Sequence, residues 1–405
     1  MTILKDGVRI TKRHFLVTTL LFSFLFTLYF VFSLYLPRHF ISSPDARLLI
    51  QASVNFAIAV TLLLMIFVIN RISKLRLIYA SSVATAIAAA LLFLTSNEAL
   101  RIVTLITMGV FFAMGLLAFF TLFYRSTIAE ERGRTAGLIG FFSLPFCFVI
   151  LPLVAETLDF PSTIMLSILL SLGTLIAGRL MPNEASLITK EIKRGNYSEK
   201  RIVFLYSIPW LIFSLINVTL AKSISFSISQ QVSISLYLVL IISQLLGVVL
   251  GAVIGGVVAD FFGRRLALVF SLTLYGASSA LIGIFQNNET FALAYLGNGL
   301  SWGILLTLYF FVIWGDFSNT ENCSKMYSIG LVIYYVTMGF GVIPLQTSQL
   351  PLVISALTSC LLVFLSNIPV VLAPELLSSD FRERIKLRLH MNAARKIAEK
   401  SRSQG

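Results

Sequence analysis

The charged groups best placed to bind one another lie in one short segment that follows a long apolar run. It reads Gly256-Val-Val-Ala-Asp260-Phe-Phe-Gly263-Arg264-Arg265. Gly256 removes side-chain bulk where a neighbouring helix must come close, and Gly263 permits a sharp turn. Asp260 can cap the positive N-terminus of another helix, and the two arginines can pair with acids at neighbouring helix ends, with Asp316 as the expected partner. The alternative is that the arginines only mark the inner side of a membrane and Asp260 is solvated.

The same pattern recurs in weaker form elsewhere in the chain. The segment Ile66-Phe-Val-Ile-Asn70-Arg-Ile-Ser73-Lys74-Leu75 lies 190 residues earlier, with Asn for Asp, Ser for Gly and one remaining cation. A second charged segment, Ala129-Glu130-Glu131-Arg132-Gly133-Arg134-Thr-Ala-Gly137-Leu138, has a fainter partner around Asp316 and Lys325 to Leu331. Gly137 and Gly330 are 193 residues apart, and Pro152 and Pro344 are 192 apart. This near-constant offset indicates an internal repeat, and it makes Lys74, Glu130 and Arg132 candidates for helix-end contacts in the first half.

Composition shows which elements must hold these groups. The chain has 405 residues, 57% hydrophobic and 12% charged, with a mean hydropathy of +0.91. A soluble globular enzyme is excluded, because a particle of this size could not bury so much apolar surface. The apolar residues lie in continuous runs and not in alternation, which disfavours a membrane barrel. Twelve runs can span a bilayer, the weakest (162–177) only with residues 178–181: 15–36, 48–69, 77–95, 102–123, 135–155, 162–177, 202–220, 234–259, 266–285, 291–314, 326–347 and 350–372.

The distribution of Lys and Arg predicts the orientation of these spans. With both termini cytoplasmic, the outer loops hold only Arg38, Arg47, Arg101 and Lys222, which leaves 27 of the 31 cations inside. Such an asymmetry is typical of cytoplasmic segments. We therefore expect an all-α integral membrane protein with twelve transmembrane helices in two pseudo-symmetric six-helix bundles and both termini cytoplasmic. Its parts are an N-terminal bundle (1–181), a cytoplasmic middle loop (182–201), a C-terminal bundle (202–372) and a basic cytoplasmic tail (373–405).

The tail has a pattern of its own. Phe381, Ile385 and Leu389 recur at helical spacing, with Arg and Lys on the remaining faces. This pattern fits a basic amphipathic helix on the anionic inner leaflet, and a solvated charged tail is the alternative.

With these motifs in place, the sequence resembles the major facilitator superfamily of secondary transporters. The Gly-x-x-x-Asp-x-x-Gly-Arg-Arg element and the Glu-Arg-Gly-Arg-x-x-Gly element between spans four and five are similar to that family's loop patterns, and the six-plus-six layout extends the resemblance over most of the chain. The resemblance implies alternating access, with gating contacts that form when the cytoplasmic side is closed. The sequence departs from that family's patterns in two places. The first-half loop has only a weaker form of the Gly-x-x-x-Asp-x-x-Gly-Arg-Arg element. Residues 137–145 lack the Gly- and Pro-rich helix-five motif of many antiporters. The second departure disfavours a drug/proton antiporter.

The resemblance also implies that helices 1, 4, 7 and 10 line a central cavity. Polar groups are costly in lipid, so those within spans should face the bundle interior, where they bind a solute or only bond helix to helix. The candidate substrate-binding residues are Tyr29, Asn55, Trp210, Asn217, Gln244, Asn298 and Trp302. No Asp, Glu, Lys, Arg or His falls at the centre of a span, which favours a neutral or weakly charged solute. Facilitated diffusion, or coupling to a proton or cation through an acid at a helix end, is then more plausible than a buried relay.

The remaining expectations concern partners and alternatives. We expect a multi-pass protein of the cell membrane with a small-molecule solute, no nucleic-acid partner, no cofactor or metal, and a monomer as a sufficient unit. Neither Cys147, Cys323 and Cys360 nor the three scattered histidines suggest a disulfide, metal or enzyme site. The longest outer loop is expected at 221–233. The alternatives are a proton-coupled drug or metabolite exporter and a non-transporting membrane sensor or partner protein.

Overall fold

The computed structural model describes residues 11–147, 157–182, 200–319, 321–342, 350–376 and 391. These residues form helices joined by short turns, and no strand occurs among them. The expected amphipathic helix around Phe381, most of the middle loop, and the Pro152–Pro344 pair lie outside the described residues.

The first half of the chain contributes six spans. They are α2 (Lys12–Phe30) continued by a π-helical turn η1 (Val31–Tyr35) and a 3-10 turn η2 (Leu36–His39), α3 (Pro44–Val68), α4 (Lys74–Leu94), α5 (Glu98–Ser126), α6 (Ala129–Pro145) and α8 (Phe160–Leu180). Most begin at a side-chain cap: for example, Asn97 accepts from two amides of α5, and Asp159 accepts from Ser162 N of α8. The weak run at 162–177 is therefore a full-length helix.

The second half contributes the other six spans. They are α9 (Lys200–Val218) with α10 (Leu220–Gln231), α11 (Ile234–Phe261), α12 (Arg264–Ile284), α13 (Asn288–Leu306) with the π-helical segment η6 (Thr307–Val312) and α14 (Ile313–Asp316), α15 (Cys323–Val342) and α16 (Leu352–Leu372). Ten of the spans pass a length-and-hydropathy test for crossing a membrane, and α6 and α15 complete the twelve. The prediction of an all-helical membrane protein with twelve helices is confirmed, and ten of these helices are candidate membrane spans.

The prediction of a loop at residues 221–233 is wrong. Residues 221–233 were expected to form an outer loop, but most of them form α10, which follows α9 after an interruption at Thr219 (φ −112°, ψ −77°). The reason is a helical stripe: Leu220, Ile224 and Ile228 are four residues apart, and all three are buried. The serines and glutamines between them made the segment look like a loop, although its apolar face has a helical period.

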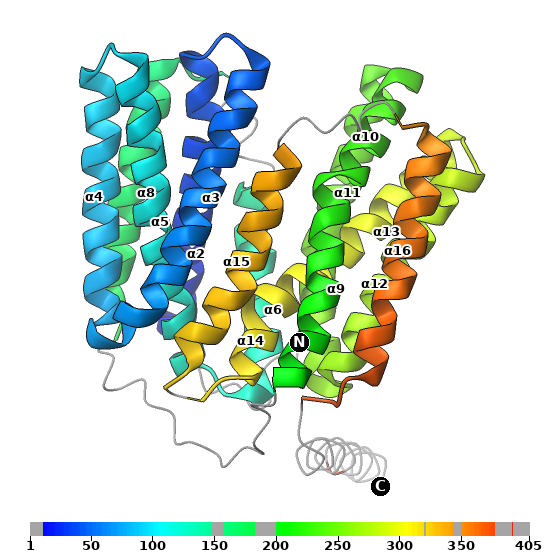
Figure 1. The fold of residues 1–405 in the computed structure, drawn as a ribbon. Helices are drawn as coiled ribbons and strands as arrows, with labels where there is room; N and C mark the ends of the chain where they lie inside the picture. The colour runs from blue at the N-terminus through cyan, green and yellow to red at the C-terminus, as the bar shows by residue number, and fades with distance from the viewer. Residues whose placement is uncertain are drawn as a thin grey trace, which may run out of the picture.

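The helices gather in two groups (Figure 1), α2 to α5 with α8 on one side and α9 to α13 with α16 on the other. Between the groups, α6 packs on α11 and α15 packs on α3. The α6–α11 contact is backbone to backbone, because a Cβ on Gly137 would lie 2.5 Å from the Ala252 carbonyl oxygen and one on Gly256 would collide with the Gly133 carbonyl. We call the end that carries the α3–α4, α5–α6, α11–α12 and α14–α15 connections the Asp260 end.

An aromatic layer fills part of the space between the halves, on the side of the Asp260 end. We define it as Phe22, Phe119, Phe120, Phe123, Phe310, Phe311 and Tyr327, all at most 1% exposed. The Phe311 ring on η6 meets Phe22 of α2 at 5.0 Å and Phe120 of α5 at 5.2 Å between centroids, while Phe120 stacks on Tyr327 of α15 at 5.3 Å. Such pairs contribute about 0.5–1.5 kcal/mol each beyond their buried area. In the described structure, the two halves therefore meet through a well-packed aromatic contact.

Candidate functional site

Asp260 lies at the last turn of α11 and is fully buried. Its Oδ1 accepts hydrogen bonds from Gly133 N at 3.0 Å and from Arg264 Nη1 at 3.0 Å. Its Oδ2 accepts from Arg134 N at 2.8 Å and from Arg134 Nε at 3.3 Å. The carboxylate of one half thus binds amides in the first turns of α6 in the other half, where the helix dipole favours negative charge.

Asp316 on α14 joins the same set of charges. Its Oδ2 accepts from Arg264 Nε at 2.8 Å, and its Oδ1 accepts from Arg132 Nη1 at 2.5 Å. The Arg132 guanidinium also lies over the Tyr124 ring, 4.8 Å from its centroid. Because Arg132 and Arg264 come from opposite halves, one carboxylate holds an arginine of each. We call Arg132, Arg134, Asp260, Arg264 and Asp316 the charge cluster.

The turn between α11 and α12 is held by a residue from the far end of the chain. Gly263 has φ +113°, a conformation that favours glycine, and is the only residue with positive φ in the described part of the chain. Beyond it, Glu375 accepts from Arg264 N at 2.8 Å and from Arg265 N at 3.1 Å, so that it caps the first turn of α12. Of the two arginines expected to pair with Asp316, Arg264 makes the contact, and Arg265 is not part of the charge cluster.

The first-half candidates occupy a weaker version of this arrangement. Lys74 is buried, and its Nζ donates to the carbonyl oxygens of Ile69 (2.8 Å) and Ile72 (3.1 Å). Asn70, which stands where the second half has Asp260, donates from Nδ2 to Glu321 O and accepts from Ser324 Oγ at the start of α15. Glu130 accepts from Arg134 Nη2 through its backbone oxygen. Where the second half has Asp260 in the charge cluster, Asn70 makes neutral hydrogen bonds to the other half.

The candidate substrate residues fall into three separate groups. Tyr29 donates from its hydroxyl to Asn55 Oδ1 at 2.8 Å, and the Tyr29 ring lies 5.6 Å from the Tyr335 ring of the other half. The Asn55 Nδ2 and Tyr335 hydroxyl atoms are buried without a hydrogen-bond partner among the described residues. These three residues thus place unsatisfied polar groups at the contact between the halves.

Trp210 belongs to an aromatic stack. Its ring lies 4.5 Å from Tyr309 and 5.7 Å from Tyr334, and its Nε1 donates to Gly330 O at 2.9 Å. Trp302 is partly buried and is linked to this stack through Phe213, 6.0 Å from each tryptophan. Both tryptophans act here as packing groups.

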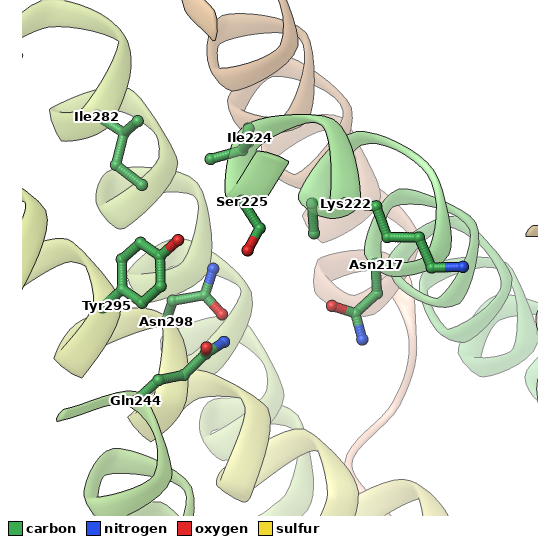
Figure 2. A pocket seen from close by; sticks show the side chains of 9 residues that line it. Asn217, Lys222, Ile224, Ser225, Gln244, Ile282, Tyr295 and Asn298 are labelled. Atoms are coloured by element: carbon green, nitrogen blue, oxygen red, sulfur yellow. The ribbon is translucent and has the colours of Figure 1, made fainter. Parts of the chain in front are cut away.

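The other three candidates line one cavity. Asn217, Gln244 and Asn298 border a space of about 210 Å³ together with Lys222, Ser225 and Tyr295. Figure 2 shows the carboxamides of Gln244 and Asn298 and the Ser225 hydroxyl directed toward one another, while Lys222 runs away from them. All of these residues belong to α9, α10, α11 and α13.

Comparisons with solved structures decide the fold. The human organic anion transporter MFSD10 (TETRAN) superimposes with a TM-score of 0.66 at 12% identity, over 89% of this chain and 99% of that one. The major facilitator superfamily transporter FucP, in its outward conformation, gives 0.63 at 13% identity, over 88% and 98%. This chain has the major facilitator superfamily fold. Both of these solved structures are of transporters.

The sequence comparisons give less information than the structural comparisons. No protein-family model matches the chain. A lincomycin resistance protein of Streptomyces lincolnensis is 33% identical over 119 residues, which is 28% of this chain and 22% of that protein. The chain therefore matches about a fifth of that relative's length.

Among the residues of these sites that the sequence did not single out are Arg134, Tyr335 and Glu375. Arg134 was visible in the Glu-Arg-Gly-Arg segment, but nothing in the segment showed that it, and not Arg265, would bind an aspartate. Tyr335 was one of several tyrosines in the same span. Glu375 follows the last span directly after Pro374, and the Pro182 that ends the sixth span, 192 residues earlier, was the available signal.

Proposed function

We propose that this protein is a transporter that moves a small solute across the membrane by alternating access of its two halves. The observation that carries the proposal is the charge cluster, in which Asp260 and Asp316 bind groups of the opposite half through buried, charge-assisted hydrogen bonds. Such contacts exist only while this end is closed. Differential contacts of a few kcal/mol are enough to set the balance between two conformations.

The Asp260 end is proposed to be cytoplasmic. The support is the excess of Lys and Arg in the segments at this end, which resist translocation. On this orientation, both termini are cytoplasmic, and the structure corresponds to a state closed toward the cytoplasm.

The solute is proposed to be neutral or weakly charged. Tyr29, Asn55 and Tyr335 offer hydroxyl and amide groups at the contact between the halves, while the ionisable groups of the charge cluster are engaged with one another. A neutral solute would satisfy the Asn55 and Tyr335 groups without bringing an unpaired charge into the membrane. If an ion is coupled, the proposed carrier is Asp316, because protonation there would release arginines of both halves together.

A proton-coupled drug exporter is the second candidate. It is favoured by the partial match to the lincomycin resistance protein. The two candidates differ in direction and in energy source, so one reconstituted system can separate them.

The test is flux in proteoliposomes that contain the full chain. The panel comprises neutral sugars and polyols, organic anions, organic cations and lincomycin, with and without an imposed proton gradient. We expect gradient-independent flux of a neutral solute, and a large reduction in Asp316→Asn but not in Asp159→Asn, which changes an exposed aspartate. Gradient-driven lincomycin movement would support the exporter instead. No flux of any solute by folded protein would overturn both and favour a sensor or partner protein.

A further inference from the structure

The cavity beneath α10 differs from the central contact because it is built by one half alone. Its walls come from α9 (Asn217), α10 (Ala221, Lys222, Ile224, Ser225), α11 (Gln244), α12 (Ile282) and α13 (Tyr295, Asn298). Every one of these helices belongs to the second half of the chain. By contrast, part of the space between the halves is occupied by the aromatic layer.

The cavity presents hydrogen-bonding groups that are free to take a ligand. Asn298 Oδ1 is buried without a partner among the described residues, although the Asn298 amide also lies near the Tyr275 hydroxyl. A buried, unsatisfied carbonyl oxygen destabilises the protein, and a bound donor would recover that cost. Because carboxamides both donate and accept, Asn217, Gln244 and Asn298 can each bind a hydroxyl group as donor or as acceptor.

The charges around the cavity favour a neutral ligand. No carboxylate is among the described residues that line it, so an ammonium group would find no counter-ion. Lys222 lines the rim, but its Nζ donates to Gly341 O at 3.0 Å on α15 and points away from the carboxamides in Figure 2. A carboxylate ligand would therefore lose its hydration without gaining a close cation.

The remaining wall is apolar and aromatic. Ile224, Ile282 and Tyr295 are at most 7% exposed and pack in one cluster. Tyr295 lies one helical turn before Asn298 on α13, so this apolar wall adjoins the carboxamides and offers a surface for the C–H face of a ring. The cavity volume of about 210 Å³ limits the occupant to a small molecule.

We propose that this cavity binds a small, neutral cyclic polyol, held by the carboxamides of Asn217, Gln244 and Asn298 and by the ring of Tyr295. The interruption at Thr219 lets α10 act as its roof, because α9 and α10 are not one continuous helix. Since one half makes the whole site, rocking of the halves does not take it apart. The ligand therefore binds equally well in both conformations, and a ligand with equal affinity for two states shifts neither. Binding requires no flux, so this inference stands or falls separately from the transport proposal.

The test is protection of a cysteine in the cavity of the purified full chain. Ser225→Cys is made in a Cys360→Ala background, because Cys147 and Cys323 are buried. Modification by methyl methanethiosulfonate is followed by mass spectrometry with myo-inositol, glucuronate or glucosamine, which are similar in size and differ in charge. We expect myo-inositol alone to slow modification. Equal slowing by the charged analogues, or no slowing by any of the three, would overturn the proposal.

Two further variants locate the effect. Asn298→Leu should raise the half-protecting concentration of myo-inositol about tenfold, the loss expected for one buried hydrogen bond. Asn367→Leu is the matched control, since Asn367 is a partly buried asparagine of α16 outside the cavity. If Asn298→Leu does not fold, Asn217→Leu serves in its place.

A gate variant tests whether the site belongs to one half. Asp316→Asn should leave the half-protecting concentration unchanged, because Asp316 contributes nothing to the cavity. Three results would each overturn a site made by the second half alone. They are unchanged protection by myo-inositol in Asn298→Leu, loss of protection in Asn367→Leu, and a changed half-protecting concentration in Asp316→Asn.

Discussion

Replacing Asp260 by asparagine removes the charge from the centre of the contact between the halves. The side chain keeps its shape but loses one of two accepting oxygens. Asp260 accepts from Gly133 N, Arg134 N, Arg134 Nε and Arg264 Nη1 at 2.8 to 3.3 Å. An amide group facing these donors leaves at least one of them buried without a partner.

The size of the effect follows from burial. Breaking a buried ion pair by removing one partner costs about 3–5 kcal/mol. Arg264 retains its bond to Asp316 at 2.8 Å, so the lower end of this range, about 3 kcal/mol, is the better figure. The contacts between halves exist only in the closed state, so the cost falls on that state. At about 1.36 kcal/mol per decade, the closed-to-open ratio should fall about a hundredfold.

The assay is distance measurement between spin labels on the two halves. One pair joins Arg71 and Phe262, exposed positions at the Asp260 end; the other joins Glu98 and Asn288, exposed positions at the opposite end. The partly exposed Cys360 is replaced by alanine beforehand. In Asp260→Asn, we expect the first distance to lengthen and the second to shorten.

The control is Asp159→Asn. Asp159 accepts from Ser162 N at 3.0 Å in an exposed cap of α8, so the same chemical change there should leave both distances as in the original protein. Unchanged distances in a folded Asp260→Asn protein would refute the reasoning. They would mean that the charge cluster contributes nothing to the balance between conformations.

Three further changes have expected outcomes. Gly256→Ala places a methyl group against the backbone of α6 and should destabilise the protein or its closed state by about 1–3 kcal/mol, measured by melting and spin-label distances. Gly283→Ala is the control, because a methyl group there meets only side-chain atoms. An equal effect of Gly283→Ala would contradict the close-contact argument. Trp210→Phe removes the indole hydrogen bond and should destabilise by about 1–3 kcal/mol; an unchanged melting temperature would contradict this. Arg132→Lys keeps the charge at Asp316 but not the planar stacking, so transport should fall less than in Arg132→Ala, as flux will show.

The sequence was informative wherever the repeat or the apolar period decided the outcome. The twelve spans follow from apolar length, and the contact of Asp316 with an arginine of the α11–α12 turn follows from helix-end charges. The sequence could not show which arginine makes that contact. Arg264 and Arg265 are adjacent, and the selection depends on the Gly263 turn and on Glu375, which caps α12 from more than a hundred residues away.

Two other features depend on three-dimensional packing. Period and composition disagreed at 221–233, where serines suggested a loop and buried isoleucines produced a helix. The polar residues of the spans could be listed from the sequence, but not grouped. Asn217, Gln244 and Asn298 share a cavity only because α13 packs closely on α11, at Gly247 and Gly251.

The π-helical segment η6 has a consequence for how such a chain can change over generations. A π-helical turn holds one residue more than an α-helical turn, and the extra residue is accommodated within the segment, so that the α-helices on either side keep their phase. Thr307–Val312 therefore sets the direction of the Phe310–Phe311 pair independently of Asn298 above it and Asp316 below it. A single codon gained or lost in this segment could re-aim the aromatic pair in one step, while the polar cavity and the charge cluster keep their own residues. Relatives that carry different solutes should then differ in chain length within Thr307–Val312 before they differ at Asp260 or Asp316.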